Sequence, residues 1–336
     1  MNQYVWGNQE TQFFYEIGPD DILNAVDCLG FRSTGRILQL NSLENRVYQV
    51  EIELEHESNN PSDHFLIIKF YRPGRWTKEQ ILEEHEFLFD LNEEEIPVIC
   101  PLKINGVSLF ETKNIFYTLF PKKGGRIPDE LDEEKALNLG RLMGRVHLVG
   151  QKKVAKHRLH LNPHTFGNQN VNYLLENKLI NPHIESLYQK TWEQLEKVMT
   201  PLFENIPYQR IHGDCHRANI IYAKEGFSLL DFDDMVMGPK IQDIWLLFPA
   251  KDEESIMLRD EFFAGYEEFN ALNYNQYKLI EPLRTLRLIH FSAWIGKRIQ
   301  DPFFQRTFPY YGTVEYWNQQ VKDLQDQYET IISYNA

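Results

Sequence analysis

The sequence has few cysteines, an excess of acidic over basic residues, and no long apolar run. Its 336 residues include three cysteines, Cys28, Cys100 and Cys215, which are too few and too scattered for a disulfide framework or a four-ligand zinc site. Lys and Arg total 35 against 49 Asp and Glu, a formal net charge of −14 that disfavours general binding to nucleic acid or anionic membranes. Any phosphate-binding site must therefore be local.

The distribution of apolar residues excludes an obvious membrane or export signal. No stretch of about 18 consecutive apolar residues occurs, and the amino-terminal residues lack the basic start and apolar run of a signal peptide. The low cysteine count fits a reducing compartment, so we expect a cytoplasmic protein that does not bind membranes. With 42% hydrophobic and 13% aromatic residues, the chain can form a packed core.

The first third of the chain predicts a β-hairpin followed by a helix. In residues 46–71, apolar residues alternate with polar ones, a polar turn follows, and FLIIKFY resumes the β pattern with Lys69 on the second strand. Thr77 and Gln80 then have the spacing of a capping box, ahead of an apolar stripe that predicts a helix over residues 78–91.

A second β-like run, residues 115–120, ends at the turn-rich sequence PKKGG. We place a lobe boundary there, between residues 1–120 and residues 121–336. Beyond it, apolar residues recur mainly at helical spacing, so the larger lobe is expected to be mainly helical.

Three polar residues of the larger lobe carry the most informative pattern. In the sequence HGDCHRAN, Asp214 lies five positions before Asn219, and Asp231 follows a short apolar strand, which is the layout of a kinase catalytic loop and metal-binding segment. Asp214 suits a catalytic carboxylate that orients an attacking hydroxyl and accepts its proton. Asn219 and Asp231 supply the oxygen ligands that magnesium prefers.

Two other interpretations of this segment remain open from the sequence. The three residues often cap turns or end strands without any chemical role. Alternatively, His212, Asp214 and His216 form a zinc or iron site, because imidazole and carboxylate are ordinary ligands for these metals. This second interpretation leaves the pattern of Asn219 and Asp231 unexplained.

Upstream residues suggest a partner site for phosphate groups. Lys69 lies in an apolar strand, where its charge needs a carboxylate or a phosphate to offset desolvation. Glu84 lies in the apolar stripe of the predicted helix and is the expected partner, with Glu83 as the second choice. Ser42, in a glycine-free polar turn, offers a hydroxyl that phosphates could approach.

These motifs together resemble the aminoglycoside and choline phosphotransferase superfamily of kinase-like enzymes. Within it, the sequence is most similar to the stress response kinase A group of bacterial serine/threonine protein kinases. The resemblance extends over most of the chain and is carried by LNSLENRVYQV, IKFYRPGRWTKEQILEEHEF, IHGDCHRANI, DFDD and GPKIQDIWLL. It implies an α+β, bilobal, protein-kinase-like fold with a small β-rich amino-terminal lobe and a larger mainly helical lobe.

The resemblance also implies specific roles in the larger lobe. Asp214 would be the catalytic base, Asn219 and Asp231 would bind magnesium, and Asp231 would also act in catalysis. Asp243, in QDIW, would brace the catalytic loop. The connector after Phe120 would hold the adenine of ATP by backbone hydrogen bonds.

In the smaller lobe, the resemblance implies that Lys69 contacts the ATP phosphates and pairs with Glu84, while Ser42 contacts ATP from the loop that covers the phosphates. The implied cofactors are ATP and Mg²⁺. The implied partner is a protein with a Ser or Thr acceptor, which includes this chain itself, and we expect a monomer.

The sequence departs from ordinary eukaryotic kinases in ways that bear on regulation. His-Gly-Asp replaces His-Arg-Asp, Asp-Phe-Asp replaces Asp-Phe-Gly, and neither a glycine-rich loop nor Ala-Pro-Glu occurs. We therefore do not expect control by activation-loop phosphorylation. Asp233 is left with two interpretations, a metal-facing carboxylate or an outward-facing or hydrogen-bonded one.

Three functional classes follow from these patterns. They are a protein kinase, a small-molecule kinase acting on an aminoglycoside, a choline-like molecule or an amino alcohol, and a silent nucleotide-binding module. The complete set of Lys69, Asp214, Asn219 and Asp231 argues against the silent module. The two kinase classes share the same chemistry, and the local motif does not identify the acceptor.

Overall fold

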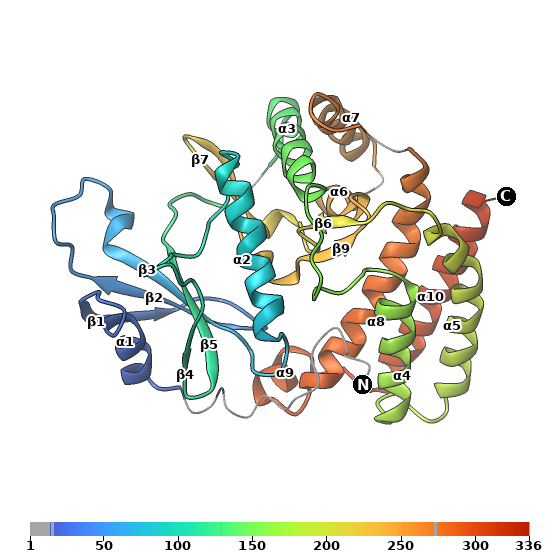
Figure 1. Cartoon of the computed structure of the whole chain (residues 1–336). Helices are drawn as coiled ribbons and strands as arrows, with labels where there is room; N and C mark the ends of the chain where they lie inside the picture. Colours follow the sequence, from blue (N-terminus) through green and yellow to red (C-terminus); the bar gives the residue numbers. More distant parts are fainter. Residues whose placement is uncertain (1–13, 15–16, 129, 251, 272–273, 336) are drawn as a thin grey trace.

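A computed structural model of the chain describes residues 14, 17–128, 130–250, 252–271 and 274–335. A β-rich amino-terminal part lies on one side and a mainly helical part on the other (Figure 1), as the sequence predicts. The proposed lobe boundary falls at the end of one strand of the sheet and stays a proposal. The expectation that the chain lacks an export signal rests on amino-terminal residues, most of which lie outside the described residues.

The amino-terminal part is built on one antiparallel sheet of five strands in the order β1-β2-β3-β5-β4. The predicted hairpin is confirmed, because β2 and β3 pair with Val47 opposite Lys69. The small helix α1 packs against β1, and alternate residues of the central strands form a separate hydrophobic core. The elements are α1 (Pro19–Asp27), β1 (Ser33–Gln39), β2 (Arg46–Ile52), β3 (Phe65–Phe70), β4 (Phe110–Thr112) and β5 (Ile115–Pro121).

Helix α2 (Lys78–Glu93) joins the two parts of the molecule, and its predicted position is confirmed. The capping box forms as expected: the Gln80 amide donates to the Thr77 hydroxyl at 3.3 Å, and the Thr77 amide donates to the Gln80 side chain at 2.9 Å. Phe87 and Leu91 of this helix belong to the core of the helical part. The helix therefore packs on both sides (Figure 1).

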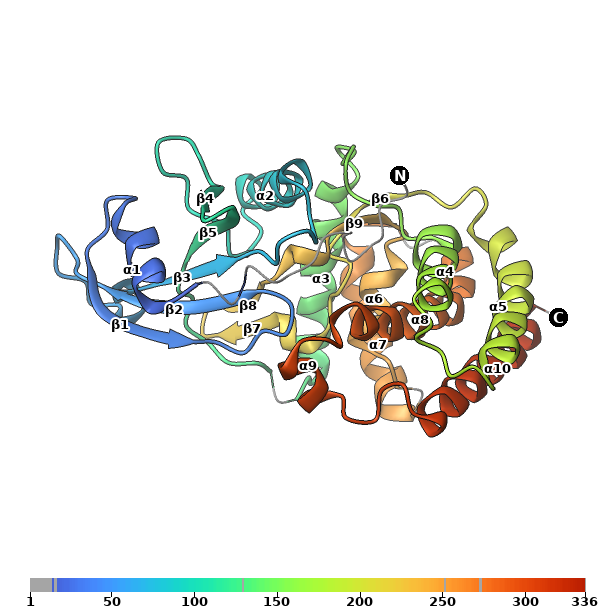
Figure 2. The ribbon, with the colours of Figure 1, turned by 90° about the horizontal axis from the view of Figure 1, so that it is seen from below.

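The helical part surrounds two short β-ribbons that hold the polar loops. Strand β6 pairs with β9, and β7 pairs with β8, so residues 212–219 and 230–235 are each anchored at both ends. Figure 2 shows α4, α5 and α10 on the side of α8 that faces away from the sheet. The strands are β6 (Gln209–Ile211), β7 (Ile220–Ala223), β8 (Gly226–Leu229) and β9 (Val236–Gly238). The helices are α3 (Glu133–Gly150), α4 (Gln169–Glu176), α5 (Glu185–Met199), α6 (Ile241–Leu247), α7 (Glu253–Glu267), α8 (Ile280–Arg298), α9 (Pro302–Thr307) and α10 (Val314–Asn335).

Within the described residues, every helix is too short or too polar to serve as a transmembrane span.

Glycines allow α3 to pack directly on α7. A Cβ atom added at Gly140 would lie 1.9 Å from the carbonyl oxygen of Phe262, and one added at Gly265 would lie 2.0 Å from that of Leu137. Both distances are far shorter than a van der Waals contact, so a side chain at either position would force the two helices apart. This packing fixes α3, whose His147 contacts Asp243, the residue of α6 that braces the polar loop described below.

We predict that Gly140→Ala destabilises the protein, although alanine is the better helix former by about 1 kcal/mol. Forcing the helices apart should lower the free energy of unfolding by about 1–3 kcal/mol. Chemical denaturation measures the change, with Leu148→Ala on an exposed position of the same helix as the control. A more stable Gly140→Ala variant would mean that the two helices do not pack this closely.

Candidate functional site

A cavity of about 730 Å³ lies between the sheet and the helical part. Six residues singled out from the sequence line it, and they come from both parts of the molecule: Ser42, Lys69, Glu84, Asp214, Asn219 and Asp231. Residues separated by up to 189 positions in the chain are thus brought into one site. The remainder of the lining includes an apolar section next to Phe120 and a section formed by α8.

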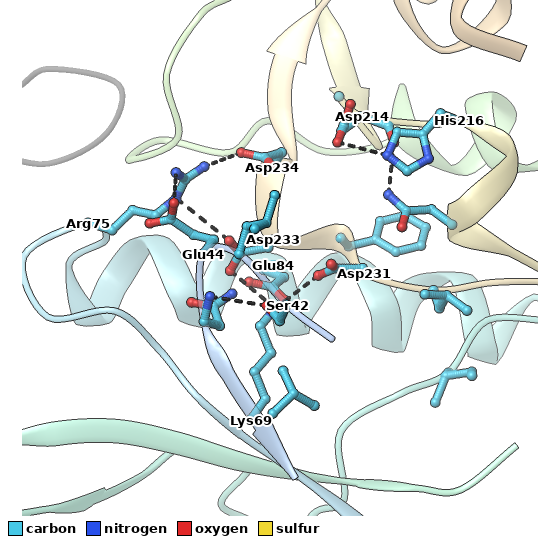
Figure 3. A pocket seen from close by; sticks show the side chains of 18 of the residues that line it. Ser42, Glu44, Lys69, Arg75, Glu84, Asp214, His216, Asp231, Asp233 and Asp234 are labelled. Atoms are coloured by element: carbon cyan, nitrogen blue, oxygen red, sulfur yellow. Dashed lines mark hydrogen bonds and ion pairs between the residues drawn. The ribbon is translucent and has the colours of Figure 1, made fainter. Parts of the chain in front are cut away.

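Lys69 lies at the centre of a buried group of carboxylates. Its ammonium nitrogen is 3.5 Å from Glu84 Oε1, 3.2 Å from Asp231 Oδ1 and 3.1 Å from Asp233 Oδ1. Figure 3 shows these side chains turned toward one another. Burial alone would lower the pKa of Lys69, but the carboxylates outweigh burial and raise its pKa well above the usual range. The lysine therefore carries a permanent charge, as the sequence predicts for a lysine in an apolar strand.

Glu84 is held from two sides, which settles the choice of partner for Lys69. One carboxylate oxygen contacts Lys69 and accepts a hydrogen bond from the Tyr71 hydroxyl at 3.4 Å. The other oxygen accepts a hydrogen bond from Arg158 at 3.1 Å. Burial raises the pKa of Glu84.

Glu83, the second choice, has a different role. Its carboxylate accepts hydrogen bonds from the backbone amides of Lys156, His157 and Arg158, at distances from 2.6 to 3.0 Å. Such charge-assisted bonds to backbone amides are among the stronger hydrogen bonds in proteins. Glu83 therefore fastens α2 to the segment that follows α3, and it does not contact Lys69.

Asp233 is an ion-paired carboxylate at the cavity wall. It is only 3% exposed, lies 3.1 Å from Lys69, and its second oxygen is 3.6 Å from Arg75. Its neighbour Asp234 also lines the cavity and pairs with Arg75. Partial burial within the protein and the charges of nearby acids raise the pKa of Asp234 to about 6 despite that pairing. Lys69 and Arg75 therefore hold Asp233 in place.

Asp243 braces the loop of residues 212–219, as expected. Its two carboxylate oxygens accept hydrogen bonds from the backbone amides of His212 and Gly213, both at 2.8 Å, and His147 approaches within 3.1 Å. Gly213 has φ of +86°, and a Cβ atom there would lie 2.1 Å from the carbonyl oxygen of Asp234. Only glycine fits this position without strain.

Asp214 projects from this loop with both oxygens engaged. Oδ1 accepts a hydrogen bond from Arg287 at 2.6 Å, and Oδ2 lies 3.3 Å from His216 Nε2. Burial alone would raise the pKa of Asp214, but the His216 hydrogen bond and the Arg287 charge hold it well below its usual range. The carboxylate is therefore ionised and able to accept a proton or a hydrogen bond from a hydroxyl.

Asn219 and Asp231 present oxygen atoms to the cavity. The Asn219 amide nitrogen donates to the backbone carbonyl of Asp214 at 3.0 Å, which directs the amide oxygen to the other side. Asp231 has a left-handed backbone conformation, with φ of +60°, and its side chain is 48% exposed. An amide oxygen and an exposed carboxylate suit a hard divalent cation that completes its shell with phosphate and water.

The geometry argues against a zinc or iron site at His212, Asp214 and His216. His212 is fully buried, donates from Nε2 to the Leu230 carbonyl at 2.9 Å, and accepts at Nδ1 from the Asp214 amide. Both ring nitrogens are thus already used. Among the described residues, no group of three His, Cys, Asp or Glu side chains has metal-binding geometry.

The loop between β1 and β2 is fixed by a buried acid that sequence reasoning missed. Glu44 pairs with Arg72 and Arg75 at 3.4 and 3.2 Å, and also with Arg298 of α8. Although burial alone would raise the pKa of Glu44, its arginine partners lower it to about 2. In the same loop, the Ser42 hydroxyl accepts a hydrogen bond from the Asn45 amide at 3.2 Å. Ser42 therefore keeps a fixed position at the cavity wall.

Other site residues also escaped the sequence reasoning. Arg158 and Arg287 lie far from the motifs whose carboxylates they contact. Sequence spacing carries no signal for either contact, because both depend on how the helices pack. The contacts of Arg75 with Asp233 and Asp234 were also missed, although both acids lie within the DFDD motif.

Comparisons with known proteins point to a phosphotransferase family. The profile of the phosphotransferase enzyme family (APH) matches residues 36–280. Stress response kinase A of Escherichia coli O157:H7 is 34% identical over 323 residues, covering 95% of each chain. Serine/threonine protein kinase RdoA of Salmonella typhimurium is 33% identical over 325 residues, with the same coverage.

A solved structure shows the same fold. The amicoumacin kinase hAmiN, in complex with AMP-PNP, Ca²⁺ and amicoumacin, aligns with a TM-score of 0.75 at 18% identity, covering 95% of this chain and 96% of that one. The predicted kinase-like fold is confirmed.

We predict that Lys69→Ala and Glu84→Ala are strongly non-additive, because the two side chains act as one buried pair. Each single variant should lose most ATP-consuming activity. The double variant should be hardly less active than the less active of the two single variants. The comparison variant is Glu86→Ala at an exposed position of the same helix that contacts Lys153, and its small effect should multiply with the loss of Lys69→Ala. Multiplying losses for Lys69 and Glu84 would show that the pair does not work as a unit.

Proposed function

This chain belongs to the phosphotransferase enzyme family, and from this premise we propose that it is an ATP- and magnesium-dependent kinase that phosphorylates a Ser or Thr hydroxyl of a protein. The observation that carries the proposal is the convergence of Lys69, Asp214, Asn219 and Asp231 on one cavity. These residue types supply what phosphoryl transfer requires: a cation for the phosphates, ligands for magnesium, and a carboxylate for the acceptor.

Asp214 is the proposed catalytic base. It orients the acceptor hydroxyl and takes its proton while the hydroxyl oxygen bonds to the γ-phosphorus and the bond to the β-phosphate oxygen breaks, releasing ADP. A strongly lowered pKa makes Asp214 a weak base, which suits a reaction in which positioning matters more than early proton removal. Asp243 keeps the loop under this carboxylate rigid.

Asn219 and Asp231 are the proposed magnesium ligands, and Asp231 is the one with catalytic importance. The free amide oxygen of Asn219 and the exposed carboxylate of Asp231 fit a cation of this kind. When it is bound, magnesium neutralises negative charge on the phosphate oxygens. Lys69 already lies 3.2 Å from Asp231, so its ammonium group is next to the position where phosphates would bind.

The opposite end of the cavity suits an adenine ring. Its apolar lining comes from both parts of the molecule, namely Val47, Ile67, Leu88, Ile99, Phe120, Ile221 and Leu230. The connector after Phe120 would offer backbone hydrogen bonds to the ring edge, and Ser42 would contact the phosphates from the covering loop.

The proposed acceptor class rests on the relatives. Two curated relatives that cover 95% of this chain are named stress response kinase A and serine/threonine protein kinase RdoA. We extend this to a role in a stress response, in the cytoplasm, by a monomer that also phosphorylates itself. The competing candidate is a small-molecule kinase, favoured by the shared fold of the amicoumacin kinase.

We predict that the purified protein transfers label from γ-labelled ATP to Ser or Thr residues of a generic protein substrate or of itself. Asp214→Asn should reduce this transfer by about 10²- to 10⁴-fold, because it removes the base and keeps the shape of the side chain. Phosphoamino-acid analysis identifies the acceptor, and thermal unfolding and nucleotide titration check that the variant folds and binds ATP. Transfer to an aminoglycoside, choline or an amino alcohol, without any labelled protein, would refute the protein acceptor and favour the small-molecule kinase.

We also predict that Asp231→Ala weakens nucleotide binding in the presence of magnesium by at least about tenfold, which corresponds to about 1.4 kcal/mol. The loss should largely vanish without magnesium, because the deleted carboxylate acts through the metal. Calorimetric titration with a non-hydrolysable ATP analogue measures both affinities, and Asp260→Ala on an exposed face of α7 is the control. Equal losses with and without magnesium would contradict the proposed ligand role.

A further inference from the structure

Arg287 of α8 is the cation next to the proposed base. Its guanidinium nitrogen lies 2.6 Å from Asp214 Oδ1, and its side chain is 42% exposed. Among the described residues, Asp214 is the acid with which it forms an ion pair. A guanidinium has five N–H donors, so the contact with one carboxylate oxygen leaves donors directed elsewhere. Because Arg287 also lines the cavity, these donors can meet a bound molecule.

Apart from Arg287, the cavity lining that comes from α8 and from the segment after α3 is apolar or neutral. It consists of Leu161, Phe166, Leu283, His290, Phe291 and Trp294. Burial lowers the pKa of His290 to about 3, so that ring is neutral. Arg287 is therefore the cation of this part of the lining, and the other basic side chain next to Asp214, His216, is already paired with the second oxygen of that carboxylate.

The acidic residues around the same cavity are committed to other cations. Glu84, Asp231 and Asp233 pair with Lys69, while Glu44 and Asp234 pair with Arg75. An acceptor with a positive charge would thus meet Arg287 and find these acids already neutralised. An acceptor with a negative charge would meet a guanidinium suited to bind it through two parallel hydrogen bonds.

We propose that Arg287 recognises an anionic group on the acceptor, next to the hydroxyl that Asp214 orients. This inference rests on the proposed kinase function and names its acceptor more closely: a Ser or Thr flanked by an acidic or phosphorylated residue. Arg287 is thus a specificity-determining residue that distinguishes acceptors by charge.

The same contact links acceptor binding to the base. While Arg287 pairs with Asp214, it occupies Oδ1, one of the two oxygens that could accept a hydrogen bond from the acceptor hydroxyl. An anion on the acceptor draws the guanidinium toward itself and so reduces its hold on Asp214. The hydroxyl proton then passes to Asp214 as the new oxygen–phosphorus bond forms and ADP leaves.

The aromatic residues of the same lining favour the opposite kind of acceptor, one with a positive charge. Phe166, Phe291 and Trp294 line the cavity, and aromatic rings attract quaternary ammonium groups. A choline-like acceptor would bind there if ring contacts outweighed repulsion by Arg287. The test therefore includes acceptors of both charges.

The experiment compares matched Ser peptides that differ at one position next to the acceptor, which carries Asp, phosphoserine, Ala or Lys. The full chain, with ATP and magnesium, should show kcat/KM at least about tenfold higher for the Asp or phosphoserine peptide than for the Lys peptide. Comparing the Asp peptide with the phosphoserine peptide shows whether the site prefers a carboxylate or a phosphate group. Equal use of all four peptides, or preference for Lys, would overturn the proposal.

Variants of Arg287 assign the preference to this residue. Arg287→Gln should abolish the charge preference, and Arg287→Glu should reverse it toward the Lys peptide. The control is Arg306→Gln, which removes the same charge from an exposed position of α9 outside the cavity lining and should keep the wild-type ratio. Thermal unfolding checks that each variant folds. A wild-type ratio in Arg287→Gln would refute the assignment.

A second set of acceptors separates this inference from the proposed protein substrate. If no peptide is phosphorylated, glycerate and choline replace the peptides as a small anionic and a small cationic alcohol. Transfer to glycerate that is lost in Arg287→Gln keeps the anion preference and refutes only the protein acceptor. Preference for choline, or no transfer to any acceptor, overturns the inference.

Discussion

The buried guanidinium of Arg158 holds together the elements on which the site depends. It donates to the Gln80 carbonyl at 2.8 Å and to Glu84 at 3.1 Å, both on α2. It also donates to the backbone carbonyls of Asp233 and Met235, in the segment that carries Asp231. A buried charge is costly unless hydrogen bonds satisfy it, and a planar guanidinium with five donors can satisfy all four partners at once. The position of α2 and that of the proposed metal-binding segment are therefore set by the same side chain.

This arrangement limits how the site can move. Glu83 binds three consecutive backbone amides of the segment that contains Arg158, so α2 is fastened to the helical part next to the Lys69–Glu84 pair. An outward swing of α2 would have to break both sets of contacts. The structure thus favours a site whose lysine–glutamate pair is already assembled, in keeping with the absence of an Ala-Pro-Glu motif and of a glycine-rich loop in the sequence.

The sequence predicted the elements whose signals are local. The β-hairpin with Lys69, the capping box of α2, and the spacing of Asp214, Asn219 and Asp231 all depend on residues close together in the chain. The choice between Glu83 and Glu84 was not settled by spacing alone, because adjacent helix positions face different neighbours that only packing defines. The contact between Arg287 and Asp214 spans 73 positions and follows from the placement of α8, so nothing in the local pattern indicates it.

The proposed nucleotide site depends most directly on Arg158, which keeps both halves of this site in place. Arg158→Lys keeps the charge but cannot make the same four hydrogen bonds, because an ammonium group lacks the planar fork. Calorimetric titration of the folded variant with magnesium and a non-hydrolysable ATP analogue, below its unfolding temperature, tests this dependence. The account predicts an affinity at least about tenfold below that of the wild type, a loss of about 1.4 kcal/mol. Wild-type affinity in the folded variant would contradict it.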